Sequence, residues 1–576
     1  DLPFFDDFSQ QSPLPSPQLW ADSSAYINTG YPLDPPTIGV ATLDAVNKTG
    51  SFYPGTNIGQ LYAADALTSL PLHLNFPGDP TIYLSFYYQP QGLADAPEPE
   101  DSLVLEFYAP DLDEWESIWS AQGTESRDFR LVHLPVSQKR FLKDGFRFRF
   151  RNYASLSGIQ YPSRASNADH WHIDYVLLDR GRDQEDTVFH DVAFVMPLTS
   201  LLRDYQAMPW PHYIYADQVP MQATNSFRYR NLDNEPRFID TLLFRFTELN
   251  NLFPNPDVLD AGSFNVPSST DITFDRGVNY TYPKEKGDSA RFEVETRLVT
   301  DDFDPKSNNR MVFHQVFHNY YAYDDGSAES GYGLSGEGTQ FAKVAYRFHT
   351  YQQDTLRGVQ MYFNPTLTGN TEDIYFYLTV WDNDNGKPGK ELYSKTNYRP
   401  EFNHELNDFA LYPFQSYDNE LQDTFVVVQD TFFIGWIKTT NDILNIGLDL
   451  NQDAQSELFY NITGAWEPST INGALMMRPM FGPSLRMAAS GPASPAQTRQ
   501  VKAWPNPAHD YIMLQLPDME GQTQITLYNS HGQPVRTFTC RKRLRRLDVS
   551  GFPPGFYMLQ GRNGTLLYRG KFLIAY

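Results

Sequence analysis

The chain has 576 residues, more than one hydrophobic core can organise, so several domains are expected. Its formal net charge of −25 excludes the basic footprint of a nucleic-acid binder. No apolar run approaches the roughly 20 residues that cross a bilayer as a helix, and the single cysteine, Cys540, excludes an internal disulfide.

The composition favours many short strands joined by turns, because aromatic residues make up 15% of the chain and 42 Pro and 36 Gly are spread along it. The predicted class is therefore all-β, a multidomain string of β-sandwiches. The expected blocks are a jelly roll (1–185), an immunoglobulin-like spacer (186–320), a second jelly roll (321–486), a linker (487–500) and a small immunoglobulin-like domain (501–576). Short helices or turns are expected near 63–70 and 201–206. The start at Asp1 indicates a processed N-terminus, or an engineered one.

In the first block, Phe and Arg alternate without a break from Phe146 to Arg151, which predicts a strand with one apolar face. Further marks of this block are Phe4 to Ser9, Trp20 and the segment from Asp169 to Val176. Together they resemble a MAM-type, concanavalin-like jelly roll over residues 1–180.

The first and last strands pair in folds of that kind, which would bring Asp7 close to Asp174. Two carboxylates at one seam repel each other unless a cation or a donor lies between them, and oxygen ligands suit Ca²⁺. The alternative is that both aspartates accept hydrogen bonds from the backbone and from arginines. His170 and His172 share one face of their strand, but no third histidine or cysteine is near enough in the sequence to indicate zinc.

Trp115 and Trp119 are candidates for stacking on a sugar ring, as are Trp210 and Trp466. Each of these side chains is better explained as part of a hydrophobic core. Jelly rolls often bind sugars, so a glycan-binding surface is one of the functions to be considered.

The 186–320 block contains no motif that indicates chemistry. The 321–486 block resembles a jelly roll recurrent in surface proteins of the Bacteroidota, and its acidic residues Asp324, Asp325 and Glu329 could surround Ca²⁺ together with Asp449 or Asp382. The segment from Asp382 to Gly386 begins like a calcium loop, but its twelfth position is Tyr393 and not Glu. A hairpin turn is the better interpretation of that segment.

No recognisable enzyme motif is complete. His404 to Asp408 lacks the second histidine of H-E-x-x-H, and Gly333 to Glu337 lacks the last glycine of G-x-S-x-G. Carboxylates are so numerous that a glycosidase pair stays open, since only the distance between two carboxylates in the fold would reveal one. The chain is therefore expected not to be an enzyme.

The last block differs in charge from the rest. Residues 501–576 carry 10 Lys and Arg against 4 Asp and Glu, a net of +6, while the preceding residues carry 35 against 66, a net of −31. The block contains a set of short motifs in a fixed order: Pro505, Asn506 and Pro507, then Gly532, Asp548, Gly555, Tyr557 and Lys571. This order resembles the type A C-terminal sorting domain of type IX secretion in Bacteroidota.

The resemblance implies a secreted protein at the outer face of the outer membrane, with residues 501–576 bound by translocon or shuttle proteins. A structural or adhesive component of a surface assembly is the function expected, with other outer-membrane or surface proteins as partners. The alternatives are a glycan-binding module and a hydrolase without a recognisable motif. The basic run from Arg541 to Arg546 is expected to be a solvated hairpin edge, or a contact for an acidic partner or lipopolysaccharide. A retained sorting domain would serve as a dock.

Overall fold

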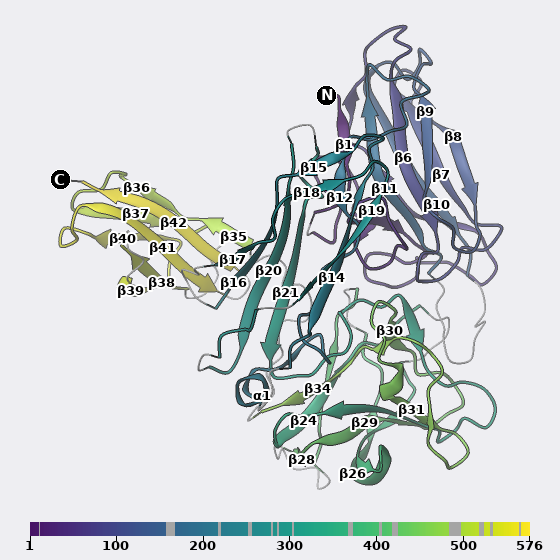
Figure 1. Ribbon diagram of the computed structural model, residues 1–576, viewed down its shortest axis with the longest axis vertical. Helices are drawn as coiled ribbons and strands as arrows, with labels where there is room; N and C mark the ends of the chain where they lie inside the picture. Colours follow the sequence, from purple (N-terminus) through teal and green to yellow (C-terminus); the bar gives the residue numbers. More distant parts are fainter. Residues whose placement is uncertain are drawn as a thin grey trace. The chain divides into compact units, whose positions relative to one another are not determined.

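The structure is a computed structural model. It describes residues 1–10, 12–156, 168–216, 220–250, 256–277, 280–284, 287–301, 304–366, 372–402, 406–416, 424–482, 497–517, 523–529, 534–563 and 566–575. The chain divides into two compact units, Asp1–Ala488 and Ala489–Tyr576. The described residues form an all-β protein (Figure 1) with one short α-helix, α1 (Trp210–Tyr215), and one 3-10 turn, η1 (Gln455–Glu457). No helix in these ranges is long and apolar enough to cross a bilayer.

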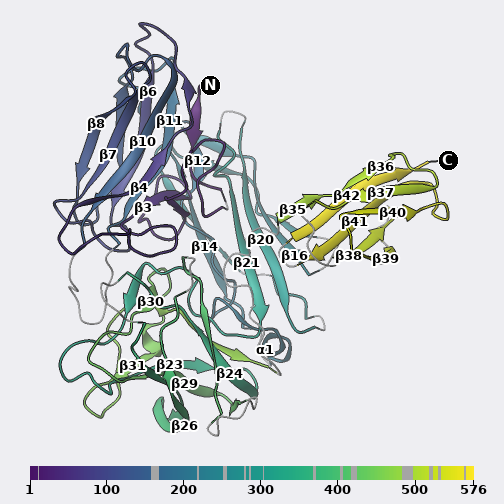
Figure 2. The same ribbon diagram turned by 180° about the vertical axis from the view of Figure 1, so that it is seen from behind.

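The first sandwich consists of two sheets, drawn in purple and blue in Figures 1 and 2. One sheet has the order β2-β3-β11-β6-β9, with β1 also paired to β11. Its strands are β1 (Phe4–Asp6), β2 (Tyr26–Asn28), β3 (Val40–Leu43), β6 (Tyr83–Pro90), β9 (Arg130–Pro135) and β11 (Trp171–Asp179). The other sheet has the order β4-β10-β7-β8, with β5 paired to β10. Its strands are β4 (Tyr62–Thr68), β5 (Leu72–His73), β7 (Ser102–Ala109), β8 (Glu114–Gln122) and β10 (Asp144–Ala154).

The alternation from Phe146 to Arg151 forms the middle of β10, as predicted. Phe146, Phe148 and Phe150 are completely buried between the two sheets, while the arginines between them face outward. The expected pairing of the first and last strands is also present, because β1 runs antiparallel to β11 with Asp6 opposite Val176.

The second sandwich (teal in Figure 1) has a three-stranded sheet, β12-β14-β19, a five-stranded sheet, β13-β21-β20-β16-β17, and a two-stranded antiparallel sheet, β15-β18. The strands are β12 (Val192–Phe194), β13 (Met208–Pro209), β14 (Thr224–Asn231), β15 (Arg237–Ile239), β16 (Thr241–Glu248), β17 (Asp257–Asp260), β18 (Phe264–Val266), β19 (Asp271–Gly277), β20 (Ala290–Val299) and β21 (Arg310–His318). The large aromatic side chains Trp210, Tyr213 and Tyr282 fill its core.

The third sandwich (green) contains the sheets β22-β30-β33, β26-β25-β29-β23-β31-β32 and β27-β24-β28, with β34 also paired to β24. Its strands are β22 (Ser330–Tyr332), β23 (Lys343–His349), β24 (Asp354–Met361), β25 (Phe376–Asp384), β26 (Lys387–Tyr398), β27 (Ala410–Pro413), β28 (Val426–Val428), β29 (Thr431–Lys438), β30 (Ile446–Asp449), β31 (Leu458–Asn461), β32 (Glu467–Pro468), β33 (Ala474–Leu475) and β34 (Met477–Phe481). The turn from Asp384 to Lys387 joins β25 to β26, so the hairpin interpretation of the Asp382 segment is confirmed.

The three sandwiches contact one another within the first unit. One hydrophobic cluster runs without interruption from the second sandwich into the third, and it includes Tyr213, Phe317, Tyr346 and Phe481. Between the first and third, the Tyr31 hydroxyl donates to the carbonyl of Ala328 at 3.2 Å. The three sandwiches therefore belong to one compact unit.

The first and second sandwiches meet through polar side chains. Arg228 and Arg230, both on β14, bind the carboxylate of Asp34, and Arg230 also donates to the carbonyl of Pro35 at 3.2 Å. The hydroxyl of Ser307 donates to Asp7.

Within the first sandwich, Gly39 permits the close approach of two segments. Its φ is +103°, and a Cβ at this position would lie only 2.3 Å from the carbonyl oxygen of Phe8.

The second unit is a small sandwich with the sheets β35-β42-β41-β38-β39 and β36-β37-β40. Its strands are β35 (Gln497–Gln500), β36 (Lys502–Trp504), β37 (Tyr511–Gln515), β38 (Thr523–Tyr528), β39 (Pro534–Cys540), β40 (Leu544–Asp548), β41 (Gly555–Asn563) and β42 (Leu566–Ile574). Cys540 is completely buried, as a packed small residue. Residues 541–543 connect β39 in one sheet to β40 in the other and are exposed.

Two local predictions are wrong. Residues 62–68 form β4 and not a helix, because β4 pairs with β10 along the sheet. Residues 201–206 form bends, in keeping with the turn alternative, and the α-helix lies at 210–215. Residues 497–500, assigned to the linker, form β35, which runs parallel to β42. In each case a strand or helix is set by contacts with residues far away in the sequence, which local patterns do not report.

Candidate functional site

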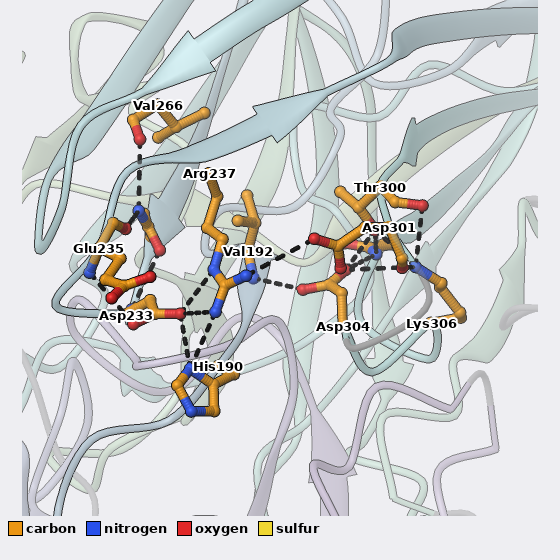
Figure 3. Close-up of polar contacts among 12 residues, drawn as sticks. His190, Val192, Asp233, Glu235, Arg237, Val266, Thr300, Asp301, Asp304 and Lys306 are labelled. Atoms are coloured by element: carbon orange, nitrogen blue, oxygen red, sulfur yellow. Dashed lines mark hydrogen bonds and ion pairs between the residues drawn. The ribbon is translucent and has the colours of Figure 1, made fainter.

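A dense polar network lies at one end of the second sandwich (Figure 3). His190 Nδ1 is 2.7 Å from the Asp233 carboxylate, which also forms an ion pair with Arg237. Arg237 reaches toward Asp301 at 3.5 Å, and so connects this pair with the loop that carries Asp304. The carboxylate of Asp304 accepts a hydrogen bond from the backbone N–H of Val192 at 2.7 Å.

This network is structural in its chemistry. The side chain of Asp233 is completely buried, and although burial opposes ionisation, hydrogen bonds from His190 and Arg237 hold its pKa below the usual range. The cavity between the two halves of the network has a volume of about 10 Å³, room for at most one water. Thr300 Oγ1, the hydroxyl lining the cavity, donates to Asp304 and is not aligned with His190 as a nucleophile.

A second group of carboxylates follows the contact between the first and second sandwiches, and we call it the acidic seam: Asp7, Asp174, Asp191 and Asp304. All four are buried. Burial raises the pKa of Asp174 well above its usual value, and repulsion from Asp7 adds to the effect. Asp7 accepts from Ser9 Oγ at 2.6 Å, and Asp174 accepts from the backbone N–H of Thr37 at 2.9 Å. These donors are backbone N–H groups and hydroxyls, and no arginine among the described residues forms an ion pair with either aspartate.

Asp324, a predicted ligand of calcium, is held by a cation of the chain itself. Its carboxylate receives Nε of Arg478 at 3.1 Å from each oxygen, and Nη2 forms a further short contact. Both side chains are buried, and the guanidinium also lies over the ring of Phe409, 4.0 Å from its centroid. The structure therefore places this carboxylate in an ion pair.

Asp325 and Glu329 do lie together, and Asp449 lies beside them. Glu329 accepts from the backbone N–H of Leu450 at 2.7 Å, and Asp449 accepts from the backbone N–H of Asp325 at 2.6 Å. Burial raises the pKa of Glu329 and of Asp449 well above the usual values, and repulsion from Asp325 adds to both. These hydrogen bonds from backbone N–H groups connect the loop that contains Asp325 and Glu329 to the segment that contains Asp449 and Leu450. Asp382 is engaged elsewhere, accepting from the backbone N–H of Lys390 at 2.6 Å.

One group of carboxylates meets the spacing of a metal site, and the sequence predictions did not include it. The ligand oxygens of Glu98, Asp101 and Asp169 all lie within 4.8 Å of one another. Among the described residues, neither the pair Asp7–Asp174 nor the third-sandwich acids belong to a group of this spacing. The available signal was position: Asp101 directly precedes β7, and Asp169 precedes β11 by two residues, so both lie at strand starts.

The two tryptophans proposed for sugar stacking face opposite sides of their sheet. Trp115 is opposite Tyr108 and faces outward, whereas Trp119 is opposite the buried Leu105, because a β-bulge separates the two pairings. The guanidinium of Arg149 covers the ring of Trp115 at 4.1 Å from its centroid. Trp119 packs against Phe86 at 5.2 Å.

The remaining tryptophan candidates are also occupied. Trp210 is buried in the second sandwich, and Trp466 packs edge-on against Trp381 at 5.4 Å between ring centroids. Trp115 and Trp466 are partly exposed but lie in different sandwiches, and Trp115 and Trp119 lie on opposite faces of their sheet. The exposed aromatic pair that a glycan platform needs is therefore not formed by them.

The Pro-Asn-Pro-Ala segment of the last block lies against the last strand of the second unit. The side-chain carbonyl of Asn506, between the exposed Pro505 and Pro507, accepts from the backbone N–H of Leu573 at 2.8 Å. The backbone N–H of Ala508 donates to Leu573 O at 2.7 Å. The Pro-Asn-Pro-Ala segment is thus fastened to the last strand, β42.

The other motif residues support turns and core packing. Asp548 accepts from the Ser550 hydroxyl at 2.6 Å and closes the turn after β40. Tyr557 is buried, stacks on Phe572 at 5.7 Å and donates its hydroxyl proton to Pro553 O at 2.8 Å. Gly555 begins β41, and Lys571 is exposed on β42. Gly532 lies outside the described residues, as do His404 and Glu405 of the incomplete H-E-x-x-H motif.

Residues 502–575 match the secretion system C-terminal sorting domain. The matched segment covers the sandwich of the second unit from β36 to the end of β42. The chain is therefore a secreted protein whose C-terminal block is a sorting domain. More particularly, it is a cargo of type IX secretion, which is exported to the cell surface or released from the cell.

Solved structures resemble the chain only weakly. A calcium-binding mutant of beta-glucuronidase 2 from Bacteroides uniformis is 10% identical, with a TM-score of 0.20, over 48% of this chain and 30% of that one. A GH2 beta-galacturonidase from Eisenbergiella tayi bound to galacturonate is 7% identical, with a TM-score of 0.21, over 56% and 44%. The matches span less than half of either enzyme, and similarity this low establishes no common fold. No curated protein is significantly similar in sequence.

Proposed function

We propose that this type IX cargo is a non-enzymatic structural or adhesive component of an assembly at the outer membrane. The observation that carries the proposal is the fusion of three sandwiches into one body. Polar side chains are used at the contacts between them: Arg228 and Arg230 with Asp34, Tyr31 with Ala328, and Tyr205 with His349 at 2.9 Å. A body braced in this way suits the transmission of force or the spacing of partners.

The proposed absence of catalysis has its own support. The two best-formed cavities among the described residues have volumes of about 10 and 20 Å³, and both lie in polar contacts within the first unit. A glycosidase needs two carboxylates flanking a cleft that admits a sugar ring. A drug-sized ligand occupies about 300 Å³ or more, so these cavities suit one water each.

We also propose that Ca²⁺ stabilises the first unit. This proposal is supported by the many buried carboxylates of the first unit. The chain forms no internal disulfide, and it contains 70 acidic residues but only 45 basic ones. A bound divalent cation neutralises repulsion that the chain's own basic residues leave uncompensated. Chelator-treated protein should therefore unfold at a lower temperature than the same protein with millimolar CaCl₂.

The partners in this proposal are of two kinds. Residues 501–576 would bind translocon or shuttle proteins during export, and the acidic first unit would bind other outer-membrane or surface proteins. Glycan or lipopolysaccharide binding is the alternative, and it would require a surface other than Trp115 and Trp119.

Cross-linking on intact cells, followed by affinity purification and mass spectrometry, tests the proposed assembly. We expect one or more surface proteins in fixed stoichiometry with this chain. Recovery of the chain without any stoichiometric partner, or hydrolysis of a polysaccharide by the purified protein, would overturn the proposal. Binding to a glycan array in the absence of protein partners would favour the alternative.

A further inference from the structure

We propose that Glu98, Asp101 and Asp169 bind one Ca²⁺ ion at the end of the first sandwich. This inference rests on the calcium dependence proposed above and gives it a location. Two oxygens on opposite sides of a calcium ion are separated by about 4.8 Å, twice a Ca–O distance of about 2.4 Å. The ligand oxygens of these three residues all lie within that distance of one another.

Unpartnered oxygens point to the ion independently of the spacing. The side chain of Asp169 is completely buried, and within the described part of the chain neither of its oxygens accepts a hydrogen bond. Oε2 of Glu98 is buried without a donor as well. A buried carboxylate without a donor costs several kcal/mol, so a proton or a cation has to compensate it.

The described part of the chain supplies no such cation. No Lys, Arg or His among the described residues forms an ion pair with any of the three acids, in contrast to Asp324, which Arg478 neutralises. Three neighbouring carboxylates without a basic partner form the environment that a divalent cation stabilises most.

The site is held in place by its surroundings. Asp101 accepts from the backbone N–H of Glu98 at 2.8 Å and from the Ser155 hydroxyl at 2.8 Å, so its orientation is fixed while each oxygen keeps a lone pair. Asp169 has φ of +50°, a left-handed conformation that costs free energy in a residue other than Gly and that recurs at ligand clamps. At Gly123, an added Cβ would lie 1.7 Å from Glu98 O, so only glycine fits beside this loop.

The ligand set indicates which ion is bound. Carboxylate oxygens are hard ligands, and no thiolate or imidazole nitrogen belongs to the group, which disfavours zinc. Mg²⁺ keeps several waters in a small octahedral shell, whereas Ca²⁺ accepts a flexible cage of protein oxygens. Asp101 precedes β7 of one sheet and Asp169 precedes β11 of the other. One ion would therefore tie the two sheets together at their shared end.

The test uses the full chain and its Asp169→Asn variant after treatment with EDTA. Bound calcium is counted by equilibrium dialysis with elemental analysis, and thermal unfolding is followed with and without millimolar CaCl₂. The wild type should gain about 5 °C on addition of Ca²⁺. The variant should bind one ion fewer per chain and lose the gain. In EDTA the variant should unfold at the same temperature as the wild type or higher, because the amide removes one of three repelling charges.

Asp111→Asn is the matched control, since this exposed carboxylate of the same sandwich pairs with Lys143 at 2.6 Å and should leave the calcium response intact. Glu98→Gln, at the half-buried edge of the site, gives the same test if Asp169→Asn does not fold. A calcium response that persists in both variants would overturn this site but leave the calcium dependence standing. The absence of any response in the wild type, or an equal response to MgCl₂, would overturn the calcium assignment, while the assembly proposal is decided separately by the cross-linking experiment.

Discussion

Arg478 holds Asp324 in a bidentate ion pair inside the third sandwich, where both side chains are almost completely shielded from water. Asp324→Asn would leave the guanidinium charge buried without its counter-charge. We expect a loss of about 3–5 kcal/mol in the free energy of unfolding, measured by urea denaturation of the first unit's transition.

A matched control comes from the surface of the same sandwich. Glu391→Gln removes the partner of Lys343, a pair at 3.3 Å with both side chains partly exposed to water, and should cost no more than about 1 kcal/mol. The double variant Asp324→Asn with Arg478→Met should recover part of the first loss. Equal costs for Asp324→Asn and Glu391→Gln would contradict the assigned ion pair.

Trp119→Ala and Trp115→Ala should differ in stability although both remove the same side chain from β8. Trp119 packs against Phe86 and Tyr88 at the core face, so its loss should cost about 3 kcal/mol. Trp115 faces outward under Arg147 and Arg149, and its loss should cost about 1 kcal/mol. Chemical denaturation of the two variants checks the order, and the reverse order would show that the bulge is misplaced.

The buried ammonium of Lys438 predicts a pH dependence of stability. Its Nζ donates to Thr339 Oγ1 at 2.8 Å and to the carbonyl of Leu334, and burial lowers its pKa to about 8. The unfolded chain binds this proton up to about pH 10.5, so stability should rise with pH between about 8 and 10.5. The gain amounts to about 3 kcal/mol at 1.36 kcal/mol per pH unit.

The measurement is the difference in unfolding free energy between the wild type and Lys438→Met across that pH range. Taking the difference removes the titration of other groups that are common to both proteins. The difference should shift in favour of the wild type as the pH rises. A flat difference would show that this lysine keeps its ordinary pKa in the folded state.

Asn506→Ala should loosen the attachment of the Pro-Asn-Pro-Ala segment to β42, because the side-chain carbonyl is the acceptor for the N–H of Leu573. The loss of one hydrogen bond is about 1 kcal/mol, which corresponds to roughly five-fold faster exchange of that amide. Hydrogen exchange of the full chain measures it, and Gln515→Ala, an exposed position on β37, is the control. Unchanged exchange at Leu573 would contradict the assigned contact. Export of both variants from the producing cell then shows whether recognition needs the ordered segment.

The sequence predicted those parts of the fold that alternate regularly. Phe146, Phe148 and Phe150 identify β10 because a strand with one buried face repeats every two residues. The side of the sheet on which Trp119 lies could not be read in this way, because a single extra residue in the strand reverses the alternation. The fusion of the second and third sandwiches was also hidden, since a buried residue looks the same whether its partners belong to one domain or to two.

The candidate sites also differ in how well the sequence could predict them, because some are local in the sequence and others are not. The sorting motifs were recognisable because their residues follow one another in a short stretch of chain. Glu98, Asp101 and Asp169 meet only through the closure of two sheets, since Asp169 lies 68 residues after Asp101 in the sequence. Asp324 was predicted as a calcium ligand and forms an ion pair instead, because its partner Arg478 is 154 residues away and could not be recognised from the local sequence.

The position of β42 between β35 and β41 has a consequence for synthesis. This strand is the last of the second unit to leave the ribosome, yet it lies inside its sheet and receives the Pro-Asn-Pro-Ala segment from the other end of the unit. A chain truncated before β42 would therefore leave β35 and β41 without the strand that pairs with both of them.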